Sequence, residues 1–370
     1  MRESSIVVRP LPIGSHTYTE SSRLQAAGLR HATSLFEEAA RNVPIPRAPQ
    51  PIAIADYGAA IGYNSLLPIS AAIAIIRKRT RTDHAILVAH TDVPSNDFST
   101  LFSTLSDDQD SYLTKDSATY ASAVGRSFYT QILPSDSIAL GWSSWATQWL
   151  RRMPMPIPDH VEISYSADEE ARRGYTRQAA EDWRDFVAFR GRELAPGGRL
   201  VVLTVGLEPD GRSGFATAFD AIMSALAQFV DDGLITANEV RNMSIPSMGR
   251  GEKDFRAPFA PSGRFEGLEI EHLEMISGED RFWSQFQSDK DAQAFGANWA
   301  EFLRASMFPI LAAAVDSEAD GTRGRDRRSP RRRQFVEQLV ASVADQLAAA
   351  PEPMSIPLAL VVLSKRRRSA

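Results

Sequence analysis

Hydrophobic and polar positions follow two kinds of spacing in the first quarter of the chain. Apolar residues recur at loosely helical intervals over residues 18–40 and again over 64–79, which predicts two helices. Continuous apolar runs at 52–56 and 85–89 are typical of buried strands. Proline-rich residues 44–51 separate the first helix from the first strand. The order strand, helix, strand predicts a βαβ unit.

The elements that follow are less regular. The pattern predicts a helix at 98–105, a polar loop at 106–119, a short strand at 137–140 and an apolar loop at 153–158. A helix over 175–194 is expected to stop at Pro196-Gly197-Gly198, before a buried strand at 199–205. Further helices are expected at 215–232, 236–242, 279–288, 293–311 and 334–349, with a last strand at 358–363 that rejoins the sheet.

This order of elements predicts an α/β fold, a Rossmann-like sheet with helices on both faces and an added α-helical cap. We expect residues 1–212 and 334–370 to form the core, with an N-terminal segment that covers the site, and residues 213–315 to form the cap. Residues 316–333 are dense in charge, glycine and proline, which predicts a mobile loop. A chain of 370 residues suits one large domain with an added lobe, and two independent domains are the alternative.

Composition narrows the classes of function. With 46 acidic against 41 basic side chains the net charge is −5, so no basic field favours nucleic acid or an anionic membrane. The absence of cysteine excludes disulfides, a thiolate nucleophile and thiolate metal ligands. No apolar run reaches the roughly 20 residues of a membrane span and no signal-peptide core is present, so we expect a cytoplasmic protein.

Histidines and charge runs suggest no further site. The six histidines lack metal-ligand spacing, so we expect no metal and treat them as structural or surface residues. The basic run Arg331-Arg332-Arg333 is expected on solvated surface. Neither a Gly-x-Ser-x-Gly turn nor a Walker loop occurs, so hydrolases and nucleoside triphosphatases lack their motifs.

The first candidate site residue is Asp56, at the carboxyl end of the first predicted strand. Gly58, Gly62 and Asn64 follow in the turn to the next helix. Open α/β sheets bind ligands at this edge, where a carboxylate can receive an ammonium group and glycines let the backbone approach closely. Asn64 can cap the helix. Taken alone, the pattern fits a simple tight turn equally well.

The second candidate, Asp92, follows the second predicted strand. An acidic side chain at this point can bind both hydroxyls of an adenosine ribose. Alternatively, Asp92 is only a turn residue and Asn96 or Asp97 only caps the next helix. The interval of 36 positions between Asp56 and Asp92 exceeds the ~20 expected of a nicotinamide-binding fold, which disfavours hydride transfer.

Half of the six tryptophans stand in one segment, Trp142-Ser143-Ser144-Trp145-Ala146-Thr147-Gln148-Trp149. Large flat side chains can wall a pocket for a ring or an alkyl chain. Indole N–H groups and the Gln148 amide can donate hydrogen bonds to an oxygen anion. Aromatic clusters of this kind belong to the core more often than to a site, and that alternative stays open.

Several segments together resemble the plant SABATH methyltransferases, the group that includes salicylate, benzoate, jasmonate and caffeine-pathway enzymes. The resemblance extends over about residues 15–315. Residues 54–64 and 92–102 are similar to the two cofactor motifs of the family, and further matches are Gly125-Arg126-Ser127-Phe128-Tyr129, residues 142–149 and Pro196-Gly197-Gly198.

The chain departs from this family within the same motifs. Trp142, Trp145 and Gln148 stand where the family commonly has His, Tyr and Met or His, and Ala59 replaces a cysteine. Such changes alter the volume and polarity of a pocket, so the substrates of the plant enzymes are not carried over.

The resemblance implies a class I methyltransferase sheet with a helical cap over the acceptor pocket, often as a homodimer. It implies S-adenosylmethionine as methyl donor and S-adenosylhomocysteine as product. The residues implied to hold the cofactor are Tyr18, Asp56, Gly58, Ala59, Asn64, Asp92, Val93, Ser127 and Phe128. Those implied to hold the acceptor are Gln25, Trp145, Gln148, Trp149, Phe219, Met307 and Phe308, with Gln25 and Trp149 positioning its reactive oxygen.

The expected reaction is methyl transfer to the carboxylate of a small apolar acid, aromatic, indolic or terpenoid. A carboxylate with a pKa near ~4 is ionised at neutral pH, so it can attack the methyl group without a general base or a metal. The alternatives are methylation of a nitrogen or a phenol on a small aromatic compound, and an inactive cofactor-binding relative. Neither nucleic acid nor a membrane is an expected partner.

Overall fold

A single mixed sheet forms the centre of the structure, a computed structural model that describes residues 16–316 and 329–367, with side chains from residue 29 onward. Within these ranges the sheet has seven strands in the order β3-β2-β1-β4-β5-β7-β6. The parallel strands are β1 (Ile52–Tyr57), β2 (Ile86–Asp92), β3 (Thr119–Gly125), β4 (Ile138–Ser144) and β5 (Leu194–Val205). Strand β7 (Pro357–Lys365) runs antiparallel between β5 and β6 (Leu268–Ser277). This order confirms the predicted α/β class.

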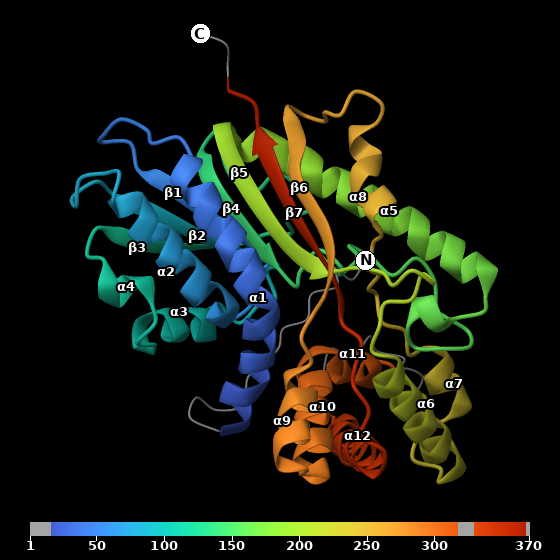
Figure 1. Cartoon of the computed structure of the whole chain (residues 1–370). Helices are drawn as coiled ribbons and strands as arrows, with labels where there is room; N and C mark the ends of the chain where they lie inside the picture. The colour runs from blue at the N-terminus through green and yellow to red at the C-terminus, as the bar shows by residue number, and fades with distance from the viewer. Residues whose placement is uncertain (1–15, 317–328, 368–370) are drawn as a thin grey trace.

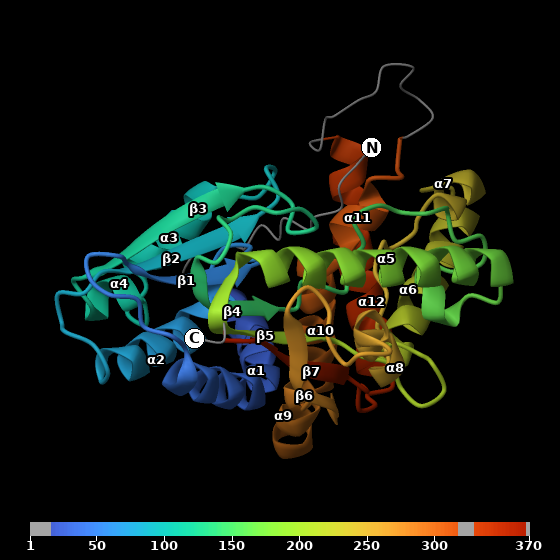
Figure 2. The same ribbon diagram turned by 90° about the horizontal axis from the view of Figure 1, so that it is seen from above.

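Both faces of the sheet are covered by helices because its central strands are apolar on both sides. Successive side chains of a strand point to opposite faces. Ile54 of β1 belongs to the hydrophobic core beneath α1 (His16–Asn42) and α2 (Tyr63–Arg77), whereas Tyr57 packs against Phe186 of α5 (Glu169–Glu193) with ring centroids 6.2 Å apart. Figure 2 shows α5 and α1 on opposite sides of β4 and β5.

A second group of helices lies beyond the end of the sheet toward which β5 points (Figure 1). Its core contains the fully buried Trp299, whose ring lies 5.1 Å from Phe282 and 5.6 Å from Phe302. The helices of this group are α6 (Ala216–Asp231), α7 (Ala237–Arg241), α9 (Arg281–Asp289), α10 (Ala292–Ser306), α11 (Phe308–Ala312) and α12 (Pro330–Ala349).

No helix of the described ranges is long and apolar enough to cross a membrane.

Three further α-helices are α3 (Phe98–Asp107), α4 (Tyr112–Lys115) and α8 (Glu252–Arg256), and two 3-10 helices span Ile163–Tyr165 and Ala257–Phe259. Helix α4 stands inside residues 106–119, which the sequence pattern assigned to a loop. Its Ser111 cap accepts a hydrogen bond from Leu113 N–H at 3.2 Å, and its Tyr112 side chain is only 1% exposed. A single helical turn is too short to show a hydrophobic period, which explains why the prediction missed it.

The prediction also missed both edge strands. Strand β3 is mostly half-buried and reads Thr-Tyr-Ala-Ser-Ala-Val-Gly, which carries little hydrophobic signal. Strand β6 lies inside residues 213–315, so the assignment of that whole range to a helical cap is wrong for residues 268–277, which pair with β7. Strand β5 begins at Leu194, immediately after α5, so Pro196-Gly197-Gly198 lies within the strand and not before it.

Two predicted boundaries near the C-terminus also change. The helix expected at 293–311 is divided at Met307 into α10 and α11, because Pro309 has no N–H with which to continue a helix. Of the predicted mobile loop 316–333, residues 317–328 lie outside the described part, whereas 330–333 form the first turn of α12.

The basic run at the start of α12 also differs from its predicted solvated state. Arg331 forms ion pairs with Glu239 at 2.5 Å and with Asp316 at 2.8 Å, and Arg332 Nε donates to the Val315 carbonyl at 2.9 Å. Arg333 is exposed, as predicted. Arg331 therefore joins α12 to α7.

Candidate active site

The carboxyl ends of β1, β2 and β4 bring the predicted motifs to one edge of the sheet. The register pairs Asp56 with His90 on one side and with Trp142 on the other. Because these strands are parallel, the residues that follow them all emerge at the same edge. The structure therefore brings together the Asp56 turn, the Asp92 turn and the tryptophan-rich segment.

Gly58 shows how closely these segments approach one another. Its φ is +84°, a conformation that favours glycine, and an added Cβ would lie 2.4 Å from the Cβ of Ala146 and 3.4 Å from a ring carbon of Phe128. Three motifs distant in sequence thus meet at one backbone position. A side chain at position 58 would separate them.

Asp92 holds the turn that follows β1. Its two carboxylate oxygens accept hydrogen bonds from the backbone N–H of Ala60 at 2.8 Å and of Val93 at 2.7 Å. The amide of Asn96 donates to the Ala60 carbonyl at 2.7 Å, so Ala60, at φ +47°, is held from both sides. Burial, together with the nearby charge of Asp56, raises the pKa of Asp92 to about 6 even though both backbone hydrogen bonds act in the opposite direction.

Asp56 is 2% exposed and belongs to a different set of contacts. Its Oδ2 accepts hydrogen bonds from Ser65 Oγ at 2.6 Å and from His90 Nδ1 at 2.8 Å. Within the described ranges no lysine or arginine forms an ion pair with Asp56 or Asp92. Two acidic side chains therefore lie at neighbouring strand ends without a strongly basic partner.

The loop that contains Ser127 and Phe128 is fixed by a fully buried ion pair at the end of α5. Arg190 donates to the carbonyls of Phe128 at 2.6 Å and Thr130 at 3.0 Å, and to Glu193 at 2.8 Å. The Glu193 carboxylate in turn accepts from Tyr57 Oη and from the backbone N–H groups of the same loop at Ile132 and Leu133. The loop is thereby joined to the end of β1.

The tryptophan-rich segment is divided between core and site edge. Trp142 is fully buried against Phe36, with ring centroids 4.9 Å apart, so the core alternative is right for this residue. Trp145 and Trp149 are partly buried. Trp145 has φ +54°, and its Nε1 is buried without a hydrogen-bond partner among the described residues.

Gln148 is held by contacts within the protein. Its Nε2 donates to the Trp145 carbonyl at 2.7 Å, and its Oε1 accepts from Thr204 Oγ1 at 3.0 Å. These two bonds fix the turn after β4. One amide hydrogen remains for a ligand, so contact with the acceptor stays a prediction.

The remaining predicted acceptor residues lie in the helical group. Phe219 of α6 is 2% exposed and packs on Tyr165 at 5.5 Å between ring centroids. Phe308 is fully buried and Met307 is partly buried. The side chains of Tyr18 and Gln25 lie outside the described part. The structure therefore leaves the acceptor roles of these residues as predictions.

Sequence reasoning missed several residues that build this site. Asn64 does not cap α2, whose first turn follows Gly62 at φ +84°. Asp97 caps α3, as one alternative held, but Asn96 holds Ala60. The roles of His90, Arg190 and Glu193 depend on partners distant in the chain, and no local spacing indicated them.

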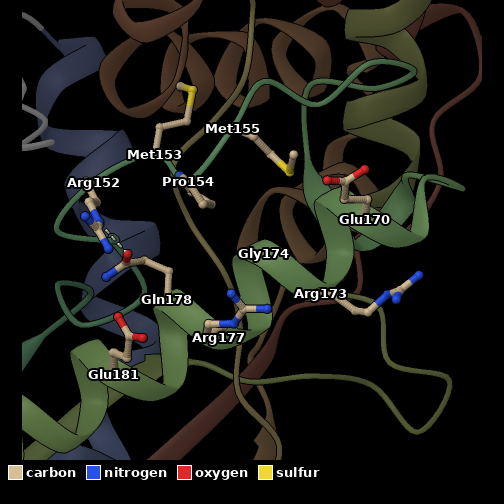
Figure 3. A pocket seen from close by; sticks show the side chains of 10 residues that line it. All are labelled: Arg152, Met153, Pro154, Met155, Glu170, Arg173, Gly174, Arg177, Gln178 and Glu181. Atoms are coloured by element: carbon tan, nitrogen blue, oxygen red, sulfur yellow. Dashed lines mark hydrogen bonds between the residues drawn. The ribbon is translucent and has the colours of Figure 1, made fainter.

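Two further observations limit the choice of site. No group of three or more histidine, aspartate or glutamate side chains in the described ranges is arranged to hold a metal ion. An open groove of about 690 Å³ lies between residues 152–155 and α5, where Figure 3 shows Pro154 and Met155 across from Gly174 and Arg177. None of the residues that line it is a predicted site residue.

Known proteins resemble this chain over most of its length. Residues 13–320 match the model of the family described as SAM dependent carboxyl methyltransferase. A benzoic acid/salicylic acid carboxyl methyltransferase of Petunia hybrida is 25% identical over 319 residues, which cover 82% of this chain and 87% of the relative. Anthranilate O-methyltransferase 1 of Zea mays is 26% identical, with coverage of 81% and 85%.

The fold is also shared with a solved structure. A loganic acid methyltransferase with S-adenosylhomocysteine superposes with a TM-score of 0.74 at 20% identity, covering 96% of this chain and 98% of that one. At this identity the likeness shows the fold alone. It confirms the class I methyltransferase sheet expected from the sequence.

Proposed function

The chain belongs to the family of carboxyl methyltransferases that depend on S-adenosylmethionine, and from this premise we propose that it forms the methyl ester of a small apolar carboxylic acid, aromatic, indolic or terpenoid. The relatives named for benzoic, salicylic and anthranilic acid support an acceptor of this size. Because Trp145 and Gln148 depart from the family's residues, the proposal carries over the class of acid and not a particular acid.

The observation that carries the proposal is the buried N–H of Trp145 directly after β4, which has no hydrogen-bond partner in the part of the chain that the structure describes. Buried donors are nearly always hydrogen-bonded, so an N–H without a partner at a ligand-binding edge indicates that a ligand atom completes it. An ionised carboxylate only accepts hydrogen bonds and suits this donor. Trp149, four residues further along the chain, offers a second partly buried indole.

The residues at the sheet edge fit the cofactor. S-adenosylmethionine carries a sulfonium and an ammonium. Asp56 is buried and Asp92 partly buried, and carboxylates with no lysine or arginine partner among the described residues are suited to a cationic ligand. We propose that Asp92, with Val93, holds the ribose and that Asp56 lies at the amino acid end. Gly58, Ala59 and Asn64 would line the turn, with Ser127 and Phe128 at the adenine side.

The mechanism requires orientation more than acid–base chemistry. When bound, the cofactor supplies an electrophilic methyl group on sulfur. Trp149 and Gln25 would hold the acceptor oxygen in line with that methyl group, and the Trp145 N–H would donate to the carboxylate. Phe219, Met307 and Phe308 would exclude water. Orientation of this kind can contribute roughly 7–11 kcal/mol in favourable systems.

A methyl-transfer screen tests the proposal. The protein is incubated with methyl-labelled S-adenosylmethionine and a panel of aromatic, indolic and terpenoid acids, and each product is treated with mild base. Release of the label as methanol identifies an ester. Base-stable products throughout the panel would point to a nitrogen or a phenol as the acceptor.

We predict that Trp149→Ala lowers kcat/KM by about 100-fold or more, because a misplaced acceptor loses in-line geometry. Binding of S-adenosylhomocysteine, measured by calorimetry, is expected to change little. Trp283→Ala, which removes a partly buried indole from α9, serves as the matched control. Equal loss of turnover and of cofactor binding in Trp149→Ala would assign the indole a structural role.

An inactive relative is the second candidate. It is favoured by similarity to an inactive anthranilate O-methyltransferase 1 of Zea mays, 25% identical with 81% and 85% coverage. Tight binding of S-adenosylmethionine with no turnover on any acid, phenol or amine would support it.

We also propose a cytoplasmic homodimer with no nucleic acid or membrane partner. The net charge of −5 and the absence of cysteine support the location and the lack of anionic partners. The resemblance to the SABATH group supports the dimer, which light scattering tests.

A further inference from the structure

Three side chains from different elements form a buried hydrogen-bonded chain next to the proposed cofactor site. Asp56 of β1 contacts His90 of β2, and His90 contacts Tyr112 of α4, each across 2.8 Å. Asp56 is 2% exposed, and His90 and Tyr112 are 1% exposed. Neither His90 nor Tyr112 has a role in the proposed reaction.

The chemistry of the three groups sets the direction of the hydrogen bonds. An ionised carboxylate only accepts, so Nδ1 of His90 carries the proton that is shared with Asp56. In a neutral imidazole Nε2 then accepts, and the Tyr112 hydroxyl donates to it. Burial first, and the charge of Asp56 in addition, raises the pKa of Tyr112 well above its usual range, which keeps this hydroxyl protonated.

Both hydrogen bonds that the Asp56 carboxylate accepts from described residues use the same oxygen. Oδ2 accepts from His90 and from Ser65 Oγ, while Oδ1 accepts no hydrogen bond from the described residues. Two donors on one oxygen fix the rotation of the carboxylate. The second oxygen is thereby held in one direction with its acceptor capacity unused.

The Tyr112 end of this hydrogen-bonded chain is also anchored to neighbouring elements. Arg77, in the last turn of α2, forms a bidentate ion pair with Asp116, which follows α4 directly, at 2.5 and 2.9 Å. Arg77 Nη1 also donates to the carbonyl of His84, just before β2, at 2.6 Å. Tyr112 therefore stands on a short helix tied to α2 and to the residues that precede β2.

We propose that His90 is a positioning residue for the cofactor: with Tyr112 behind it, it orients Asp56 so that Oδ1 receives the ammonium of the S-adenosylmethionine amino acid end. The proposal rests on the cofactor site described under the proposed function, with Asp56 at the amino acid end and Asp92 at the ribose. It adds two residues, from β2 and α4, that contact the cofactor only through Asp56.

A pair of ligands separates the two ends of the cofactor site. S-adenosylhomocysteine carries the amino acid, whereas 5′-methylthioadenosine keeps the adenosine and lacks the amino acid. Dissociation constants of both are measured by calorimetry for the full-length wild type, His90→Leu, His90→Asn, Tyr112→Phe and Asp56→Asn. The dissociation constant of 5′-methylthioadenosine divided by that of S-adenosylhomocysteine reports on the amino acid end alone. This ratio falls when the amino acid end is bound less tightly.

We expect His90→Leu to weaken S-adenosylhomocysteine by about tenfold or more, because an apolar side chain leaves Asp56 with Ser65 as its single donor. Binding of 5′-methylthioadenosine should change by less than about twofold. His90→Asn, which places an amide N–H near the former Nδ1, should restore most of the ratio. Tyr112→Phe should lower the same ratio by roughly two- to fivefold, since this substitution removes only the outer hydrogen bond.

Equal weakening of both ligands, or unchanged binding of both in His90→Leu and Asp56→Asn, would overturn the proposal. If His90→Leu does not fold, as judged by circular dichroism, the Tyr112→Phe and Asp56→Asn ratios decide. The methyl-transfer screen is independent of this result. A ligand-selective loss without ester formation would reject the proposed acceptor and keep the role of His90.

Discussion

Asp92 is the residue whose ionisation should govern cofactor binding. Burial raises its pKa to about 6, so near neutral pH it carries the charge that suits ribose hydroxyls, and below pH 6 it takes up a proton. Because the folded pKa is raised, the charged carboxylate opposes folding above that pH, and a ligand that satisfies it stabilises the folded state.

We predict that the affinity for S-adenosylhomocysteine falls as pH decreases through about 6, and is about tenfold lower one pH unit below. Titration calorimetry between pH 5 and 8 measures this directly. The same titration with Asp92→Asn, which cannot ionise, should be weak and flat. A wild-type affinity that stays constant from pH 5 to 8 would contradict the assignment of Asp92.

Individual site residues could be predicted from the sequence, whereas the residues that contact them could not. Asp56, Gly58 and Asp92 were predicted because strand ends, glycine turns and acidic side chains are local features. The contacts of Gly58 with Ala146 and Phe128 join positions 70 or more residues apart, which no spacing rule contains. Asn96 shows the same limit. Its position in the sequence fits a helix cap, but its side-chain amide holds the turn after β1.

Between elements, the ion pair of Arg190 and Glu193 joins α5, the loop at residues 127–133 and the end of β1. Both side chains are fully buried, and the guanidinium also stacks on the Tyr57 ring, 4.4 Å from its centroid. Removing one member of a buried pair leaves an uncompensated charge in the interior. The loop and the strand end would then lose their shared anchor.

Arg190→Met is therefore expected to lower the free energy of unfolding by about 3–5 kcal/mol. Arg192→Met is the matched control on the same helix, since Arg192 is exposed and lies 3.9 Å from Glu266, a separation at which a pair contributes about 0–1 kcal/mol. Urea denaturation of both variants measures the difference. Equal losses would show that the buried pair contributes no more than a surface contact.

Strands that are buried on both faces were predicted from the sequence, whereas the two strands at the edges of the sheet were missed. Strands β1, β2 and β7 read as continuous apolar runs because both of their faces are largely buried. Strand β3 and strand β6 each have one neighbour and a half-exposed face, so their sequences carry a weaker pattern. Helix α4 is one turn long, below the length at which a period is visible.

Across the whole molecule, Arg331 connects segments that are far apart in the chain. Its guanidinium pairs with Glu239 of α7 and with Asp316, and it also donates to the Leu234 carbonyl at 3.0 Å. Burial alone would raise the pKa of Glu239, but the hydrogen bonds from Arg331 and from the backbone of Asp316 and Thr236 lower it to about 2.

Because this pKa is lowered, the contribution of Glu239 to stability is complete above its ordinary pKa and is lost as pH falls toward 2. We predict that Arg331→Met lowers the free energy of unfolding at pH 7 by about 1–3 kcal/mol, a range that allows for solvent screening of the partly exposed guanidinium. Arg333→Met, at an exposed neighbouring position, should have little effect. Urea unfolding at pH 7 tests both variants, and a similar loss in each would contradict the pairing with Glu239.

The place of β7 between β5 and β6 has a consequence for the order in which the molecule can be assembled. Ribosomal synthesis proceeds from the N-terminus, so β6 emerges about eighty residues before β7, the strand that lies between it and β5. Until β7 has left the ribosome, β5 presents an open edge and β6 has no partner. The nascent protein therefore carries two unpaired strand edges while residues 278–365 are made, and chaperones that mask such edges should associate with it over that interval.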